Sequence, residues 1–118
     1  MHIITCSIIV FTIALSFLLP AQQMELNKAF GTTLKHARQM AGLTQEGFTS
    51  VSSRTYMSSL ERGFQSPTLE KLGQLAEVIG LHPITLLAAT YMERDGISAS
   101  ELIERLEKEL SALGLKLG

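Results

Sequence analysis

The sequence predicts an all-α protein made of five short helices and one further helix at the C-terminal end. Apolar residues recur at three- and four-residue spacing from about residue 27 to 91, and again from 103 to 117. Glycine, proline or a hydroxyl residue stands where each helix should end or the next should begin. No alternating apolar and polar stretch of useful length predicts a strand.

Composition sets limits on function. The 118 residues suffice for one compact domain with a short appendage. The formal net charge is −1, and residues 24–90 carry six Lys or Arg against five Glu, a balance of only +1. Overall charge therefore gives no support for nucleic-acid binding. Cys6 is the single cysteine and the three histidines are far apart in sequence, so neither a disulfide nor a metal or other cofactor is expected.

Residues 1–23 form an apolar N-terminal segment, in which residues 3–19 carry no charged side chain. A span of about seventeen residues is at the lower limit for crossing a bilayer. Three interpretations stay open: a signal peptide, a membrane anchor, or upstream sequence that is not translated. We expect translation to start at Met24, directly before the first helix of the domain, and a membrane contact only if residues 3–19 are made and inserted.

The five helices are expected within a domain at residues 24–92. The first helix should bury Phe30, Leu34, Ala37 and Ala41 and end at a cap on Gly42. Thr44 is a good N-cap for the second helix. A turn at 51–53 leads to the third helix, where Ser52 or Ser53 caps, Met57 and Leu60 are core, and Gly63 marks the end.

The fourth and fifth helices complete this domain. Ser66-Pro67-Thr68 should start the fourth helix and Gly80 should end it, while His82-Pro83 should open the fifth. The apolar positions expected to face inward are Leu69, Leu72, Leu75, Ala76 and Ile79, followed by Ile84, Leu87, Ala88 and Tyr91.

Residues 96–118 predict an amphipathic helix, with Ser98 and Glu101 in the spacing of a capping box. Its apolar residues alternate by three and four, as in a coiled-coil seam: Ile103, Leu106, Leu110, Leu113 and Leu117. Two interpretations stay open. The helix packs on its own domain, or it mediates dimerisation through Ile103, Leu106, Leu110 and Leu113.

Three stretches carry a resemblance to a known family: 44–46, 53–63 and 66–72, which read TQE, SRTYMSSLERG and SPTLEKL. In order and spacing they resemble the Cro/repressor helix-turn-helix family, often called XRE-type, of bacterial and phage transcriptional regulators. The resemblance covers about residues 27–90. It implies a five-helix lambda-repressor-like DNA-binding domain with an additional C-terminal helix, acting as a homodimeric repressor-type regulator on double-stranded DNA.

The resemblance also implies roles for individual residues. Gln45 would brace the recognition helix and contact the DNA backbone, and Glu61 would form a structural ion pair with Arg38. Tyr56 would either stack on the sugar-phosphate backbone or pack between helices. The expected DNA-binding residues are Thr44, Gln45, Ser53, Arg54, Thr55, Tyr56, Ser58 and Ser59.

The residue types fit this role. A recognition helix presents short polar side chains at the end that enters the major groove, and Arg54 can bond guanine at two points. Between Gln45 and Tyr56, however, the chain is about two residues shorter than the family pattern. Either the second helix is shortened or the turn differs.

The function expected from the sequence is a sequence-specific, cytoplasmic and nucleoid-associated transcription regulator. The alternative is a helix-turn-helix protein anchored in the inner membrane that acts through protein–protein contacts. No catalytic constellation is visible, so we expect no enzyme activity.

Overall fold

The computed structural model describes residues 21–118, and every regular element in that range is helical. The elements are α2 (Ala21–Met40), the 3₁₀ helix η1 (Gln45–Phe48), α3 (Arg54–Glu61), α4 (Leu69–Ile79), α5 (Pro83–Asp95) and α6 (Ala99–Ala112). The predicted all-α class is confirmed. The predictions for residues 3–19 lie outside the described residues.

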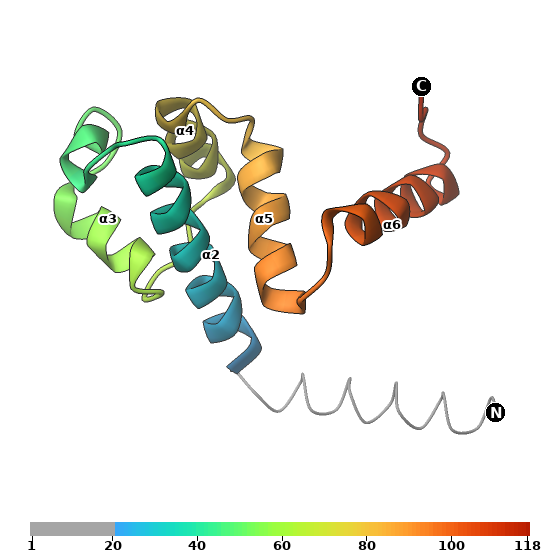
Figure 1. Ribbon diagram of the computed structural model, residues 1–118, viewed down its shortest axis with the longest axis horizontal. Coiled ribbons are helices and arrows are strands. Elements are labelled where there is room, and N and C mark those ends of the chain that lie inside the picture. Colours follow the sequence, from blue (N-terminus) through green and yellow to red (C-terminus); the bar gives the residue numbers. More distant parts are fainter. Residues whose placement is uncertain (1–20) are drawn as a thin grey trace.

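The first helix of the domain, α2, lies between α3 and α5 (Figure 1). Phe30 and Leu34 are buried and Ala37 packs against the core, as predicted. Ala41 is exposed, contrary to prediction, because the helix ends at Met40 and the chain turns outward. Gly42 takes a positive φ of 72°, and the Leu43 amide donates back to the Arg38 carbonyl at 3.0 Å, which closes the predicted cap.

The second helix is short. It consists of the four residues of η1, about one 3₁₀ turn. Of the two expectations for the stretch that is shorter than the family pattern, a shortened second helix is the one observed. Thr44 stands at its N-cap, but within residues 21–118 its side chain makes no capping hydrogen bond, contrary to prediction. The reason is that the Gly47 amide already donates to the backbone carbonyl of Thr44 at 3.0 Å, as 3₁₀ geometry requires.

The core is one cluster shared by α2, η1, α3, α4 and α5. Its buried members are Phe30, Leu34, Phe48, Met57, Leu60, Leu72, Leu75, Ala76 and Leu86. Phe48 is fully buried, so even the one-turn η1 is fixed to the rest of the fold through its last residue.

In α4 and α5, two predicted inward positions are exposed. Leu69 is the first residue of α4, directly after the cap at Thr68, and is 83% exposed. Ile84 is also exposed, because α5 turns a different face inward, with Leu86 and Thr90 buried. The Thr90 hydroxyl donates to the Leu86 carbonyl at 2.8 Å, which satisfies this polar group inside the core. The sequence pattern missed Thr90 because it followed apolar residues only.

A close backbone contact fixes α3 against α2. A Cβ at Gly31 would lie 2.4 Å from the Leu60 carbonyl oxygen and 2.6 Å from that of Glu61. Gly63, with φ of 78°, would place a Cβ 2.9 Å from the Lys28 Cα. Only residues without a side chain permit this approach, so the C-terminal end of α3 has one defined position on α2.

The last helix, α6, projects away from the other helices (Figure 1). Ser98 caps it by accepting a hydrogen bond from the Glu101 amide at 3.2 Å, which confirms the predicted start. No residue of α6 is buried in the described part of the chain. Its apolar stripe is therefore not covered by its own domain here.

Candidate nucleic-acid interface

The first turn of α3 is the exposed end of an otherwise anchored helix. Ser53, Arg54 and Thr55 are exposed, whereas Met57 and Leu60 on the opposite face are fully buried. Ser53 occupies the N-cap and accepts a hydrogen bond from the Tyr56 amide at 3.1 Å. The helix thus begins at a defined residue, with polar side chains around an end that carries unpaired N–H groups.

Farther along α3, the other predicted DNA-binding residues are less accessible. Tyr56, Ser58 and Ser59 are half-buried, and Tyr56 packs against the core. Of the two interpretations of Tyr56, packing between helices is the one present in the described chain. The hydroxyls of Ser58 and Ser59 still lie on partly exposed positions beside the first turn.

Arg54 forms an ion pair across the turn with Glu46 of η1. Its Nη1 lies 3.2 Å from the Glu46 Oε1, and the two side chains are 73% and 68% exposed. An exposed pair of this kind stabilises the fold little. It does place a carboxylate beside the cation predicted to read bases. Sequence analysis included Glu46 only as the last residue of the TQE stretch and gave it no role.

Gln45 is held from beneath by the end of α3. Its Nε2 donates to the Glu61 Oε1 at 3.2 Å, while Thr44 beside it is exposed. An amide nitrogen carries two N–H groups, so one remains for another acceptor. The contact agrees with the bracing role that the resemblance implies for Gln45.

Glu61 also binds Arg38, the partner that the resemblance assigned to it. Arg38 Nε lies 2.7 Å from Glu61 Oε2, and Nη2 lies 2.9 Å from Oε1. The Arg38 Nη1 donates to the Leu43 carbonyl at 2.9 Å. The side chains are only 12% and 4% exposed. The Glu61 carboxylate, chiefly by hydrogen bonding, raises the pKa of the Arg38 guanidinium against the opposing effect of burial.

A further contact joins α4 to the turn before α3. Lys71 Nζ donates a hydrogen bond to the Val51 carbonyl and lies 5.9 Å from the centre of the Tyr56 ring. Lys71 is half-buried. Sequence analysis missed this residue, because a lysine in a helix has the pattern of a solvated position and the partner is a backbone atom.

The residues predicted to dimerise lie together on α6. Ile103, Leu106 and Leu110 are exposed on this helix. Leu113 is exposed as well and is the C-cap residue directly after the helix ends at Ala112. The opposite face carries charges, among them Arg105 and Glu109 paired at 2.8 Å.

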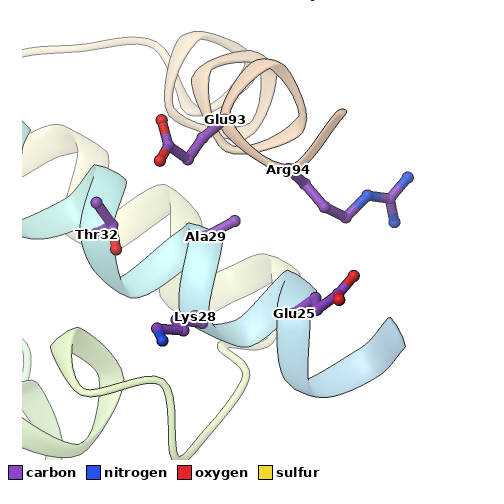
Figure 2. Close-up of a pocket in the computed structure, with 6 residues that line it drawn as sticks. All are labelled: Glu25, Lys28, Ala29, Thr32, Glu93 and Arg94. Atoms are coloured by element: carbon purple, nitrogen blue, oxygen red, sulfur yellow. The ribbon is translucent and has the colours of Figure 1, made fainter. Parts of the chain in front are cut away.

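A separate pocket lies between the first half of α2 and the end of α5 (Figure 2). It has a volume of about 310 Å³ and is lined by Glu25, Lys28, Ala29, Thr32, Glu93 and Arg94. In Figure 2, Glu93 and Arg94 leave α5 in different directions, and Arg94 is already paired with Asp95 at 2.8 Å. The mixed charges select no ligand class. Among residues 21–118, no group of three metal-ligating side chains occurs.

Between residues 21 and 118, no single helix is long and apolar enough to cross a membrane. Helices α4 and α5 reach that length and composition only together, as a pair bent by 102°.

Comparisons with known proteins agree with this geometry. The family model described as a helix-turn-helix domain matches residues 29–90. An uncharacterized HTH-type transcriptional regulator of Sinorhizobium fredii, y4dJ, is 38% identical over 69 residues, which cover 57% of this chain and 90% of that protein. Among solved structures, the clp gene regulator ClgR from Corynebacterium glutamicum has a TM-score of 0.57 and 26% identity, covering 71% of this chain and 93% of that one. On the family match and the relative together, the chain belongs to the helix-turn-helix domain family.

Proposed function

We propose that the protein is a sequence-specific DNA-binding transcriptional regulator of the Cro/repressor type. The observation that carries the proposal is the contrast along α3, whose first turn is exposed and polar while its opposite face is buried. A helix anchored in this way can enter the major groove without disturbing the core. Support also comes from the two relatives, whose names describe a transcriptional regulator and a gene regulator.

Within this function, Arg54 supplies sequence discrimination. Its guanidinium leaves α3 at the exposed first turn, and only a long forked donor at that position can reach O6 and N7 of guanine together. Ser53 and Thr55 flank it and contact bases or phosphates, with Ser58 and Ser59 on the groove walls. Tyr56 contributes through its packing beneath this turn.

Gln45 and Thr44 supply positioning. The Gln45 amide is oriented by Glu61, so its remaining N–H group has a defined direction toward a phosphate. Thr44 is exposed at the start of η1, and in the described chain its hydroxyl makes no capping hydrogen bond. The hydroxyl is therefore available to the sugar-phosphate backbone of DNA.

The test compares Arg54→Ala and Gln45→Ala on a duplex selected from a random library and on a scrambled duplex, at one fixed salt concentration. We expect Arg54→Ala to lose about 1–3 kcal/mol of discrimination between the duplexes. Gln45→Ala should weaken binding to both alike. The matched control is Arg105→Ala, an equally exposed, paired arginine on α6.

Two results would contradict the proposal in different ways. An equal loss on both duplexes for Arg54→Ala would make Arg54 a phosphate contact. If the parent protein prefers no duplex at all, the DNA-reading role is wrong. The alternative in which the domain holds partner proteins, with residues 3–19 as a membrane anchor, would then take its place.

The proposed domain division is residues 24–92 for DNA binding and 96–118 for self-association. A homodimer would place two copies of α3 about 34 Å apart on a two-fold operator. What supports self-association is the exposed stripe of Ile103, Leu106, Leu110 and Leu113. Sedimentation of Leu106→Glu and Leu110→Glu variants, beside a chain truncated after Asp95, tests it. A dimer that survives all three changes would put the interface elsewhere.

A further inference from the structure

The turn between η1 and α3 has little support from its own sequence neighbours. The helix before it, η1, is a single 3₁₀ turn. The loop's own backbone hydrogen bonds go back to the end of η1, from the Val51 and Ser52 amides to the Phe48 carbonyl at 3.0 and 2.8 Å. A short 3₁₀ segment has poorer hydrogen-bond geometry than an α-helix. The orientation of the following helix therefore depends on contacts from outside the turn.

Lys71 provides such a contact from α4. Its backbone is fixed at the helix start, because its amide donates to the capping hydroxyl of Thr68 at 3.1 Å. Its ammonium reaches the Val51 carbonyl in the turn and lies 5.9 Å from the centre of the Tyr56 ring on α3. One side chain thus joins α4, the turn and the second residue after Arg54.

We infer that Lys71 is a positioning residue that sets the angle at which α3 presents Arg54 to DNA. The inference rests on the proposed function and adds a determinant of its specificity. A hydrogen bond from an ammonium to a carbonyl is stronger than a neutral one, and the aromatic face attracts the same cation. The hydrogen bond to Val51 and the contact with the Tyr56 ring lie before and after Ser53, the N-cap of α3. The two contacts therefore hold the start of α3 from both sides.

Base reading is sensitive to such an anchor, whereas phosphate binding is not. A bidentate contact of Arg54 with guanine needs a defined helix angle, but a flexible lysine follows a phosphate wherever it lies. Loss of the Lys71 ammonium should therefore reduce discrimination between duplexes. The number of phosphates neutralised in non-specific binding should stay the same.

The test is Lys71→Met, which keeps the length of the side chain and removes the ammonium. Lys35→Met, at an exposed position of α2, is the matched control. Affinities for the selected and the scrambled duplex are measured over a range of salt concentrations. We expect the preference for the selected duplex to fall about tenfold in Lys71→Met, comparable to losing one bidentate base contact. The salt slope on scrambled duplex should match that of the parent.

Two results would overturn the inference while leaving the proposed function intact. If both affinities fall by the same factor and the salt slope shrinks by about one, Lys71 is a phosphate contact. If the preference is unchanged, α3 does not depend on Lys71. If the parent protein itself prefers no duplex, the proposed function is wrong as well. That outcome is seen without any substitution, so it is distinguishable from the two results for Lys71→Met.

A second measurement does not depend on DNA. Hydrogen exchange at the amides of residues 52–56 should be faster in Lys71→Met than in Lys35→Met, with unchanged exchange in α5. Lys71→Arg keeps a cationic donor and should restore part of the preference and part of the protection. Equal exchange in the Met variants would contradict the positioning role even if specificity changed.

Discussion

Helices α4 and α6 have the same kind of sequence and opposite surroundings. Both repeat apolar residues at three- and four-residue spacing, and both begin at a hydroxyl N-cap. In α4, Leu72, Leu75 and Ala76 lie in the core, with at most 5% of each exposed. In α6 the corresponding stripe is 37–73% exposed. An amphipathic pattern thus predicts that a helix has an apolar side, but it does not say what covers that side.

The N-terminal caps of the two helices are alike, so they do not account for the difference in burial. Thr68 accepts from the Lys71 amide at 3.1 Å and Ser98 from the Glu101 amide at 3.2 Å. What α6 lacks in the described chain is the backbone contact, the buried ion pair and the shared core that hold residues 27–95 together. Each of these can be removed in the domain and compared with a matched change outside it.

The largest effect is expected from Gly31→Ala. The new Cβ would lie 2.4 Å from the Leu60 carbonyl oxygen, and both partners are backbone, so α2 and α3 must separate. The cost should exceed the roughly 1–3 kcal/mol of ordinary overpacking, and the cooperative thermal transition should disappear. Gly73→Ala is the control, since its Cβ would meet only Pro83 Cγ at 3.9 Å. That variant should gain about 0.5–1 kcal/mol, as expected for alanine in a helix interior.

The next effect is expected from Leu75→Ala compared with Leu110→Ala. Leu75 is fully buried, so its truncation should cost about 2–5 kcal/mol in urea unfolding. Leu110 is exposed, and its truncation should leave the unfolding midpoint of a dilute sample unchanged while shifting any monomer–dimer equilibrium. A large loss from Leu110→Ala in dilute monomer would show that α6 packs on its own domain.

The two regions also differ in their ion pairs, Arg38 with Glu61 in the domain and Arg105 with Glu109 on α6. Glu61→Gln leaves the Arg38 cation without its carboxylate in a nearly closed site. We expect a loss of about 2–3 kcal/mol, below that of a completely buried pair, since Arg38 keeps some access to water. Glu109→Gln breaks the exposed pair with Arg105 and should not change Tm measurably. Equal shifts in Tm for the two variants would contradict the distinction drawn between the two regions.

Sequence reasoning succeeded where a signal is local and periodic. It placed the caps at Gly80 and Ser98 and the core positions Leu34 and Leu60, because each depends on neighbours along the chain. For α3 it left Ser52 and Ser53 open as caps, and Ser53 is the one present. It erred at Ala41 and Leu69, which follow the apolar period but lie at helix ends. It erred at Ile84 because α5 turns a different face inward.

The candidate site was predictable in outline only. The order of motifs located α3, and the family resemblance implied the pair of Arg38 with Glu61. Neither indicated Glu46 beside Arg54 or Lys71 near the Tyr56 ring. Both contacts form around the turn between η1 and α3, and the Lys71 side chain reaches it from a separate helix, α4. Spacing along the chain carries no record of such contacts.

The smallest effect tests the two caps. Thr68→Ala and Ser98→Ala each remove a single hydrogen bond to a helix N-terminus, at 3.1 and 3.2 Å, so the local change is the same. In α4 the cap is coupled to the core, and its loss should lower the free energy of unfolding of the domain by about 0.5–2 kcal/mol. In α6 the loss should fray the helix without moving the domain's transition, visible as faster amide exchange in residues 99–103 alone. If Ser98→Ala lowers the domain's stability as much as Thr68→Ala does, α6 unfolds together with the domain. Its apolar stripe must then be covered in solution, by a second copy if the loss depends on protein concentration and by its own domain if it does not.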